Sequence, residues 1–504
     1  MNDHLEVETT FAMDGDLPDL SGTTPGGVRS EAFRLEATYY DTAGLRLAAR
    51  GITCRRRTGG SDAGWHLKVP WGEGTRRELH APLSCDPPAN FVGLSAAAAR
   101  GAPLLPVARI DTERTEHRLE DEDGAALVVV ADDHVTSRDL APRTADGTVG
   151  AEDSWREVEA ELADGDRSDL DRVTAVLTRS GARPAEYPSK LRRALGHRLP
   201  PPLPRHPGSG DAATVLAHLA RYTDRLLAFD PLVRRFEPDA VHQMRVTSRR
   251  LRSALTGFRS VLRRSQTRPV ADELRHLAAV LGEVRDLEVL RERWTAHLER
   301  LPDHLVGRDR SGVWLTYLDE RMERARSEVD AFLNSPRYFA LLDSLDTLLA
   351  APPLRKKAAR GNTDLLARDI TRACARLRDR HDAALAADAA GDPQQRAAAW
   401  HEVRKSAKRV RYAARMAQSG LGKPAKRLGK WARDLQDVLG RYQDGRVGLA
   451  YLDTVGDDLI RTQPDDRESV LLTLGAVAGL EAAGGEGLLD EAEHVWGSGS
   501  RLWT

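Results

Sequence analysis

Glutamates recur at a two-residue spacing in the N-terminal part of the chain. Glu6 and Glu8 are two residues apart, and Glu157, Glu159 and Glu161 repeat this spacing in the segment WREVEAEL. In a β-strand, residues two apart project from the same face, so each set would present a row of carboxylates. Carboxylate oxygens are ligands that hard divalent cations prefer. These glutamates are therefore candidate metal ligands.

Cationic side chains follow the same spacing elsewhere. Arg55 and Arg57 would share one face of a strand, and Arg76 would share a face of another strand with Glu78. One such strand alone is most simply explained by a solvated face. Several such faces lining a barrel interior would be different, because unpaired buried charges are very costly. A polyanion bound with divalent cations would remove this cost, since arginines bind phosphate oxygens and carboxylates bind metal ions.

These residues fall in short segments that have the features of β-strands. The segments show period-two alternation or β-branched runs, with turn signals between them. They are HLEVETTF, GITCRRRT, GWHLKVP, TRRELHAPL, ALVVVADDHVTSRDL and SWREVEAEL. Only residues 168–181 and 188–196 have a helical pattern in this part of the chain. Many antiparallel strands with few helices predict a closed barrel or a sandwich.

A proline-rich segment divides the chain. Residues 199–210, LPPPLPRHPGSG, contain five prolines and two glycines, so they cannot continue a helix or pair centrally in a sheet. We predict one domain over residues 1–198, a linker over 199–210 and a second domain over 211–498. Residues 1–200 contain 25 Lys and Arg against 34 Asp and Glu, whereas the remainder contains 50 against 42. This asymmetry indicates two units with different ligand chemistry.

After the linker the apolar period changes to 3.6 residues, and Ala, Leu and Arg dominate. This pattern predicts an all-α bundle. The expected helices cover residues 212–229, 239–264, 270–299, 311–333, 363–387, 394–418 and 424–442.

Two motifs of the helical region occur twice. VHQMRVTSRRLRSAL and WHEVRKSAKRVRYAA align without gaps at an offset of 159 residues, and LGEVRD (281–286) and LGRYQD (439–444) align at an offset of 158. Two matched landmarks at nearly one offset indicate an internal duplication. The candidate anion-binding residues of the two copies are His242, Arg245, Arg249 and Arg252, and His401, Arg404, Lys408 and Arg411.

The intervals of three, four and three residues place each set on one helical face. A single histidine on a helix is usually structural, and a single arginine-rich face is usually solvated. Metal binding by these histidines is disfavoured, because neither helix has a second histidine at ligand spacing. A duplicated face of like charges is better explained by a shared basic surface for an anion, which Asp286 and Asp444 would neutralise in part.

Residues 1–200 resemble the CYTH domain, or triphosphate tunnel metalloenzyme family. The resemblance rests on Glu6-x-Glu8, YYDTAGLRLAARGITCRRR, GWHLK, TRRE, WREVEAEL and the late Ser189-Lys190. It implies an eight-stranded antiparallel β tunnel or barrel that binds triphosphates. Implied ligands of Mg²⁺ or Mn²⁺ are Glu6, Glu8, Glu157 and Glu159, with Glu161 and either Asp132 or Asp133 as further carboxylates. Implied triphosphate-binding residues are Arg55, Arg57, Lys68, Arg76, Arg114 and Lys190.

The same resemblance implies metal-assisted hydrolysis, in which metal ions offset phosphate charge and orient water, and cations stabilise the leaving diphosphate. The residues implied to be catalytic are Glu6, Glu8, Lys68 and Arg76. One position departs from the family motif E-x-E-x-K, because its last residue here is Thr10. Threonine cannot supply an ammonium beside the reacting phosphate, so turnover could be weakened, altered or lost while binding survives.

The helical region resembles the CHAD domain, the conserved histidine α-helical domain, over about residues 211–495. This resemblance implies two four-helix bundles related by pseudo-twofold symmetry, with basic faces that line a central pocket and bind inorganic polyphosphate. Many charge-assisted contacts would make such binding strongly salt-dependent. Nucleic acid is the weaker alternative partner, because aromatic residues for base stacking are sparse near the basic helices.

Two functions are therefore expected from the residues and their resemblance. The first is metal-dependent hydrolysis of inorganic triphosphate, with a helical domain that binds polyphosphate. The second is a protein that binds triphosphate and polyphosphate without turnover.

The remaining features concern location. No run of 18 uninterrupted apolar residues occurs, and the segment MNDHLEVETTF lacks the regions of a secretory signal. Three cysteines cannot form a disulfide framework. We expect no membrane partner and a cytoplasmic protein, with association with polyphosphate granules as a further expectation.

Overall fold

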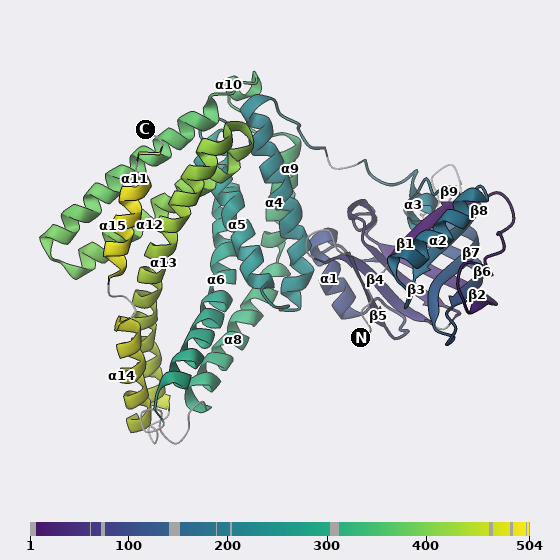
Figure 1. Cartoon of the computed structure of the whole chain (residues 1–504), viewed down its shortest axis with the longest axis horizontal. Coiled ribbons are helices and arrows are strands. Elements are labelled where there is room, and N and C mark those ends of the chain that lie inside the picture. Colours follow the sequence, from purple (N-terminus) through teal and green to yellow (C-terminus); the bar gives the residue numbers. More distant parts are fainter. Residues whose placement is uncertain are drawn as a thin grey trace. The chain divides into compact units, whose positions relative to one another are not determined.

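The computed structural model describes residues 7–60, 62–71, 76–140, 152–187, 189–201, 204–302, 312–462, 467–483, 487–499 and 501–502. The chain divides into two compact units (Figure 1). One consists of Met1–Leu203 with Leu227–Arg235, and the other of Pro204–Leu226 with Phe236–Thr504.

The first unit is built on one antiparallel sheet. Its strands are β1 (Glu8–Ala12), β2 (Gly27–Asp41), β3 (Thr53–Thr58), β4 (Gly64–Pro70), β5 (Arg76–Ala81), β6 (Leu105–Glu120), β7 (Ala126–Asp139), β8 (Glu152–Leu162) and β9 (Arg183–Pro184). The strand order is β5-β4-β3-β2-β6-β7-β8-β1-β9. The expected antiparallel fold is confirmed, but the sheet has nine strands where eight were expected. The difference is the two-residue β9, which pairs with β1 at one edge.

The two longest strands, β2 and β6, were missing from the segments expected to be strands. The first half of β2 is mostly exposed on both faces, so its sequence carries little apolar alternation. The unit also contains the helices α1 (Ala89–Ala99), α2 (Arg167–Arg179) and α3 (Lys190–Leu195) and a 3₁₀ turn, η1 (Ala48–Arg50). The sequence pattern predicted α2 and α3 but not α1.

The two faces of the sheet differ in character. Over β1, β7 and β8 one face is apolar and includes Phe11, Val130 and Val158, which pack against Leu170 and Val173 of α2. Because successive residues of a strand alternate between faces, the charged residues between these positions project from the opposite face. The packing of α2 on the apolar face therefore fixes which face is left for charged side chains.

The second unit consists of two sets of helices. The first set is α4 (Gly210–Arg234), α5 (Ala240–Gly257), α6 (Arg264–Arg300), α8 (Gly312–Leu333) and α9 (Pro336–Ala350). The short α10 (Lys356–Ala359) leads to the second set, which is α11 (Leu365–Ala390), α12 (Pro393–Met416), α13 (Gln418–Thr462), α14 (Arg467–Ala483) and α15 (Leu488–Gly499).

The helices of the two sets correspond in order, which confirms the expected duplication and the all-α class of this region. α5 corresponds to α12, and α6 corresponds to the part of α13 beyond a kink at Gly422. In the first repeat α6 packs against α5, α8 and α9, and in the second repeat α13 packs in the same order against α12, α14 and α15 (Figure 1). The repeats contact each other through α5 and α12 and through α6 and α14. No helix among the described residues is long and apolar enough to cross a membrane.

Candidate functional site

The charged face of the sheet carries a compact carboxylate group. Asp133 of β7 lies opposite Glu157 of β8 in the ladder, and Glu159 follows two residues later on the same face. One oxygen from each carboxylate lies within 4.8 Å of the others. Lys190, at the start of α3, places its Nζ 2.9 Å from Asp133, 2.6 Å from Glu157 and 2.7 Å from Glu159.

An arginine from the neighbouring strand completes this group. Arg114 of β6 donates two hydrogen bonds to Asp133, at 2.7 and 2.6 Å, and one to Glu159 at 2.9 Å. Burial opposes ionisation of Glu159, but Lys190 and Arg114 outweigh it and lower the pKa of Glu159 to about 2. Glu159 is thus ionised at neutral pH, and Lys190 and Arg114 neutralise part of the charge of the carboxylate group.

The structure separates Asp132 from Asp133. Asp133 is fully buried among the carboxylates, whereas Asp132 projects from the opposite face and forms an ion pair with Arg156 at 2.7 Å. Of the two alternatives left open by the sequence, only Asp133 has the position of a metal-side carboxylate. The reason is the alternation of side chains along β7.

The N-terminal glutamates lie at the edge of this group. Glu8 is exposed and pairs in register with Glu161, and Glu6 lies outside the described residues. Burial and the neighbouring Glu8 raise the pKa of Glu161. Thr10 pairs in register with Glu159, so a longer cationic side chain at this position would project from the carboxylate-bearing face.

A second charged group lies on β3, β4 and β5. Glu78 is buried, and its oxygens lie 3.4 Å from Arg55, 3.1 Å from His66 and 3.6 Å from Lys68. Cross-strand pairing places these residues on one face, because Arg55 pairs with His66 and Lys68 pairs with Glu78. Arg76 belongs to β5 and shares the face of Glu78, but its side chain lies outside the described part of the structure.

Arg57 is the cation of this group whose charge and hydrogen-bond donors are least well satisfied by neighbouring residues. It forms an ion pair with Asp62, yet its Nε is buried without a hydrogen-bond partner. Burial, together with Arg55 and Arg114, lowers the pKa of Arg57. A bound anion would relieve this repulsion and accept the unused hydrogen bond.

The two charged groups face a common interior. Arg55 and Glu159 interact electrostatically, and Lys68 lowers the pKa values of Glu159 and Glu161. Since β3 and β8 are separated by three other strands in the ladder, these interactions require a strongly curled sheet. Cations from β3 and β4 therefore face carboxylates from β8 across the concave side.

Sequence reasoning gave no site role to His66, Glu78 and His80. These three residues form a second group of possible metal ligands, with atoms within 4.8 Å of one another. The signal that could have found them is the two-residue spacing of His66 with Lys68 and of Glu78 with His80. Three neighbouring cations, Arg55, Arg57 and Lys68, make this group a poorer cation site than the one around Asp133.

In the helical unit, the two histidine motifs lie on α5 and α12, which contact each other. Burial lowers the pKa of Arg249, and Arg245 and Arg404 lower it further. Arg252 of α5 and Arg409 of α12 interact in the same unfavourable way. The two basic faces therefore converge, and their repulsion is a cost that a bound anion would offset.

Glycines of the second duplicated motif make room for these arginines. A Cβ added to Gly282 of α6 would lie 3.4 Å from Arg245 Nε, and one added to Gly440 of α13 would lie 3.6 Å from an Arg404 nitrogen. The Nε atoms of both arginines are buried and lack a hydrogen-bond partner. Arg245 also contacts Asp286 at 3.4 Å, which supplies part of the expected neutralisation.

The remaining residues of the two histidine motifs lie around the converging basic faces of α5 and α12. Arg411 donates a hydrogen bond to Gln436 at 3.1 Å, and His401 has a buried Nδ1 without a partner. Burial and nearby arginines lower the pKa of His242. A cavity of about 400 Å³ lies between α5 and α12, and its lining includes Arg249, Arg252 and Lys408. We refer to it as the central cavity.

The donor set of the first unit fits a hard divalent cation. Asp133, Glu157 and Glu159 offer carboxylate oxygens only, which suits Mg²⁺ or Mn²⁺ better than a soft metal. The cation-lined cavity of the second unit offers no comparable carboxylate group among its described lining residues and instead suits a polyanion. The two units thus have different ligand chemistry.

Two family models match the chain. A CYTH domain model matches residues 4–192, and a CHAD domain model matches residues 217–453. The uncharacterized proteins MT2285 and Rv2226 from two strains of Mycobacterium tuberculosis are each 38% identical over 478 residues, which cover 90% of this chain and 91% of the relative.

Solved structures also resemble parts of the chain. PptA from Streptomyces chartreusis is 23% identical with a TM-score of 0.46, and covers 57% of this chain and 99% of its own. The CHAD domain from Ricinus communis is 24% identical with a TM-score of 0.44, and covers 58% of this chain and 94% of its own. HpAC1 from Hippeastrum, described as having a dominant triphosphatase activity, is 15% identical with a TM-score of 0.23, and covers 39% of this chain and 98% of its own. The full-length relatives and the two family models show that the chain belongs to the family of proteins in which a CYTH domain is followed by a CHAD domain.

Proposed function

We propose that the CYTH domain hydrolyses inorganic triphosphate with Mg²⁺ or Mn²⁺, and that the CHAD domain binds inorganic polyphosphate. The observation that supports the first part is the opposition of two charged groups across one concave face. Asp133, Glu157 and Glu159 would hold the metal, with Glu6 and Glu8 as further ligands. A bound metal would offset phosphate charge and lower the pKa of a coordinated water.

The protein's own residues then bind and orient the substrate. Arg55, Arg57 and Lys68 would bind phosphate oxygens from one side, and Arg114 and Lys190 from the side of the carboxylates. Because these cations are already fixed by ion pairs, little reorganisation is needed when charge develops on the leaving diphosphate. Inorganic triphosphate is favoured over a nucleotide because no sequence feature suggests a nucleobase pocket.

Two adjacent residues provide a matched test of the catalytic proposal. Asp133→Asn alters the carboxylate group, whereas Asp132→Asn makes the same change on the opposite face. We expect Asp133→Asn to lower Mg²⁺- or Mn²⁺-dependent phosphate release from tripolyphosphate by about 100-fold or more, and Asp132→Asn to retain most of it. Equal activity of the two variants would contradict the proposed site.

The second candidate function is triphosphate binding without turnover. Thr10 at the position of the family lysine favours it, as does Lys190, which already occupies the oxygens that a metal would use. Phosphate release measured with Mg²⁺, with Mn²⁺ and without metal separates the two functions. Tripolyphosphate that binds but is not hydrolysed under all three conditions would support binding alone.

For the CHAD domain, the supporting observation is the convergence of two duplicated basic faces, of which Arg249, Arg252 and Lys408 line the central cavity. Arg245 and Arg404 each repel Arg249, and both have a buried Nε without a hydrogen-bond partner. A flexible chain of phosphates could satisfy several such groups at once. Competition between polyphosphate and DNA across a salt series tests this choice, and we expect polyphosphate to bind more tightly at every salt concentration.

A further inference from the structure

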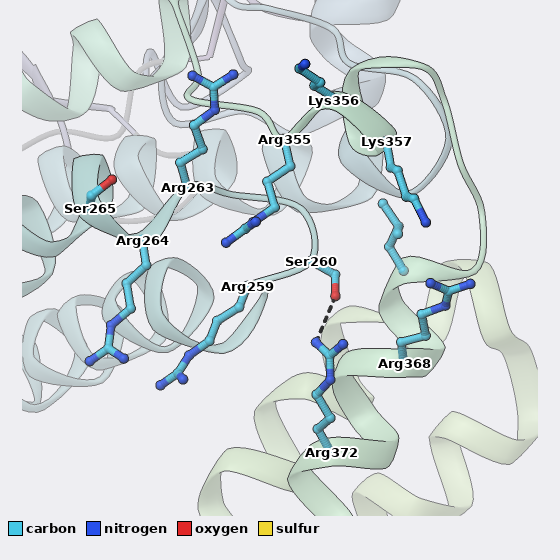
Figure 2. Close-up of a pocket in the computed structure, with 11 residues that line it drawn as sticks. Arg259, Ser260, Arg263, Arg264, Ser265, Arg355, Lys356, Lys357, Arg368 and Arg372 are labelled. Carbon is cyan, nitrogen blue, oxygen red and sulfur yellow. Dashed lines mark hydrogen bonds between the residues drawn. The ribbon is translucent and has the colours of Figure 1, made fainter.

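A second basic pocket lies near one end of the first helical repeat, and we refer to it as the α10 pocket. It has a volume of about 910 Å³ and is lined by Arg259, Ser260, Arg263, Arg264, Ser265, Arg355, Lys356, Lys357, Leu365, Arg368 and Arg372. These residues come from the α5–α6 connection, the start of α6, α10 and its preceding residue, and α11 (Figure 2). Eight of the eleven are Arg or Lys, and none of these lining residues is acidic.

Most of the positive charge in the α10 pocket is not neutralised. Arg368 pairs with Asp364, and Arg372 pairs with Asp369 at 3.1 Å and donates a hydrogen bond to Ser260 at 3.1 Å (Figure 2). Within the described part of the chain, six of the cations have no carboxylate within ion-pairing distance. These are Arg259, Arg263, Arg264, Arg355, Lys356 and Lys357. Six unpaired cations around one concavity form a strong site for a polyanion.

The α10 pocket adjoins the central cavity. Arg259 and Arg264 line both, and their side chains extend in the same direction from the beginning of the α5–α6 connection and the start of α6 (Figure 2). Burial lowers the pKa of Arg259, and Arg264, Arg376 and Arg409 lower it further. Arg376 and Arg409 line the central cavity, so cations of the two concavities lie close enough to interact electrostatically.

The α10 pocket is not a remnant of the duplication. At the offset of 159 residues, the positions of Arg259, Arg263 and Arg264 are occupied in the second repeat by Gln418, Gly422 and Lys423. Two of these three positions therefore lose their cation in the second repeat, and the third keeps one as a lysine.

We propose that the α10 pocket is a second phosphate-binding site, which one inorganic polyphosphate chain reaches from the central cavity past Arg259 and Arg264. This inference rests on the proposed binding of polyphosphate by the CHAD domain. We therefore expect the α10 pocket to bind only long polyphosphate chains, because a chain must first fill the central cavity before it extends into the pocket. Two linked sites bind one chain more tightly than either alone, since the second contact is intramolecular.

A triple substitution tests the inference. Arg355, Lys356 and Lys357 are exposed, so Arg355→Gln with Lys356→Gln and Lys357→Gln removes three charges with little effect on folding. Changing the exposed lysines of α13 to glutamine removes the same charge elsewhere in the unit and serves as the control. These lysines are Lys423, Lys426 and Lys430.

The measurement is the affinity of the full-length protein for a length series of polyphosphates, from tripolyphosphate to chains of roughly 100 phosphates. We expect the α10-pocket variant to bind the longest chains about 10-fold more weakly than wild type, with a salt slope lower by about two, and the shortest chains equally well. The α13 variant should change affinity by less than about twofold at every length.

The possible results distinguish the inference from the function on which it rests. If wild-type protein binds no polyphosphate, the proposed function of the CHAD domain is wrong. If wild type binds but the α10-pocket variant loses nothing, loses as much as the α13 variant, or loses affinity equally at all lengths, only the inference is overturned. An oligonucleotide of equal charge that competes as well as polyphosphate would overturn the choice of occupant.

Discussion

Removing the charge of Lys190 would test how the negative charge of the carboxylate group is neutralised. Its ammonium lies within 2.6–2.9 Å of three carboxylates, and its side chain is 11% exposed. Lys190→Met keeps the length of the side chain, leaves Asp133 and Glu159 with Arg114 as their close cation, and removes the ion pair of Glu157. Breaking a buried ion pair by removing one partner costs about 3–5 kcal/mol, because the other charges stay buried. We expect a loss of this size in metal-free buffer.

Hydrogen–deuterium exchange of peptides from β7 and β8 would measure this loss locally. A local readout is needed because the helical unit would dominate the unfolding signal of the whole chain. Protection of these peptides should fall by roughly 100-fold or more in metal-free Lys190→Met. Lys190→Arg keeps the charge and should lose much less.

Divalent cations supply the second half of the test. Mg²⁺ or Mn²⁺ can replace the missing ammonium on Asp133, Glu157 and Glu159, so millimolar metal should restore protection in Lys190→Met. Wild type should gain less, because Lys190 competes for the same oxygens. Unchanged protection in metal-free Lys190→Met would refute the reasoning about charge balance, and a metal effect equal to that in wild type would refute competition between Lys190 and the metal.

Three further predictions concern the same two units. Thr10→Lys should raise metal-dependent phosphate release by about 10-fold or more, because the new ammonium would lie beside Glu159, whereas Thr9→Lys, on the other face, should not. Arg245→Gln with Arg404→Gln should weaken polyphosphate binding and reduce the salt slope by about two, as measured by titration at several salt concentrations. The pKa of Glu159 is lowered in the folded protein, so its ion pairs contribute stability above the ordinary glutamate pKa that is lost as pH falls toward about 2. Glu159 should therefore cause little change in the hydrogen–deuterium exchange protection of β8 between neutral pH and pH 4. A loss of protection in this pH range would contradict the assigned ion pairs.

Much of the site could be predicted because a strand records its faces in its sequence. The two-residue spacing of Glu157 and Glu159 and of Arg55 and Arg57 was enough to expect charged rows, and the structure places all four on one concave face. The resemblance to the CYTH family added Arg114 and Lys190, which no local pattern links to the glutamates. In the helical unit, the repeated intervals of the histidine motifs predicted two basic faces in the same way.

Other features depended on contacts between distant segments. The choice between Asp132 and Asp133 needed the register of β7 against β8, since a shift of one residue exchanges the faces of a strand. The α10 pocket collects cations from separate segments that share no common period, so no local sequence pattern could reveal it.

The sequence by itself determined the two classes of domain, the duplication of the helical region and the faces on which charge would lie, because all of these follow from periodicity within single elements. Only the tertiary structure decided which charges meet. Curling of the sheet brings Lys68 toward Glu161, and folding of the first repeat brings Arg355 into the same pocket as Arg259. Periodicity specifies the direction in which a side chain points from its own strand or helix, whereas its neighbours depend on how distant elements pack together.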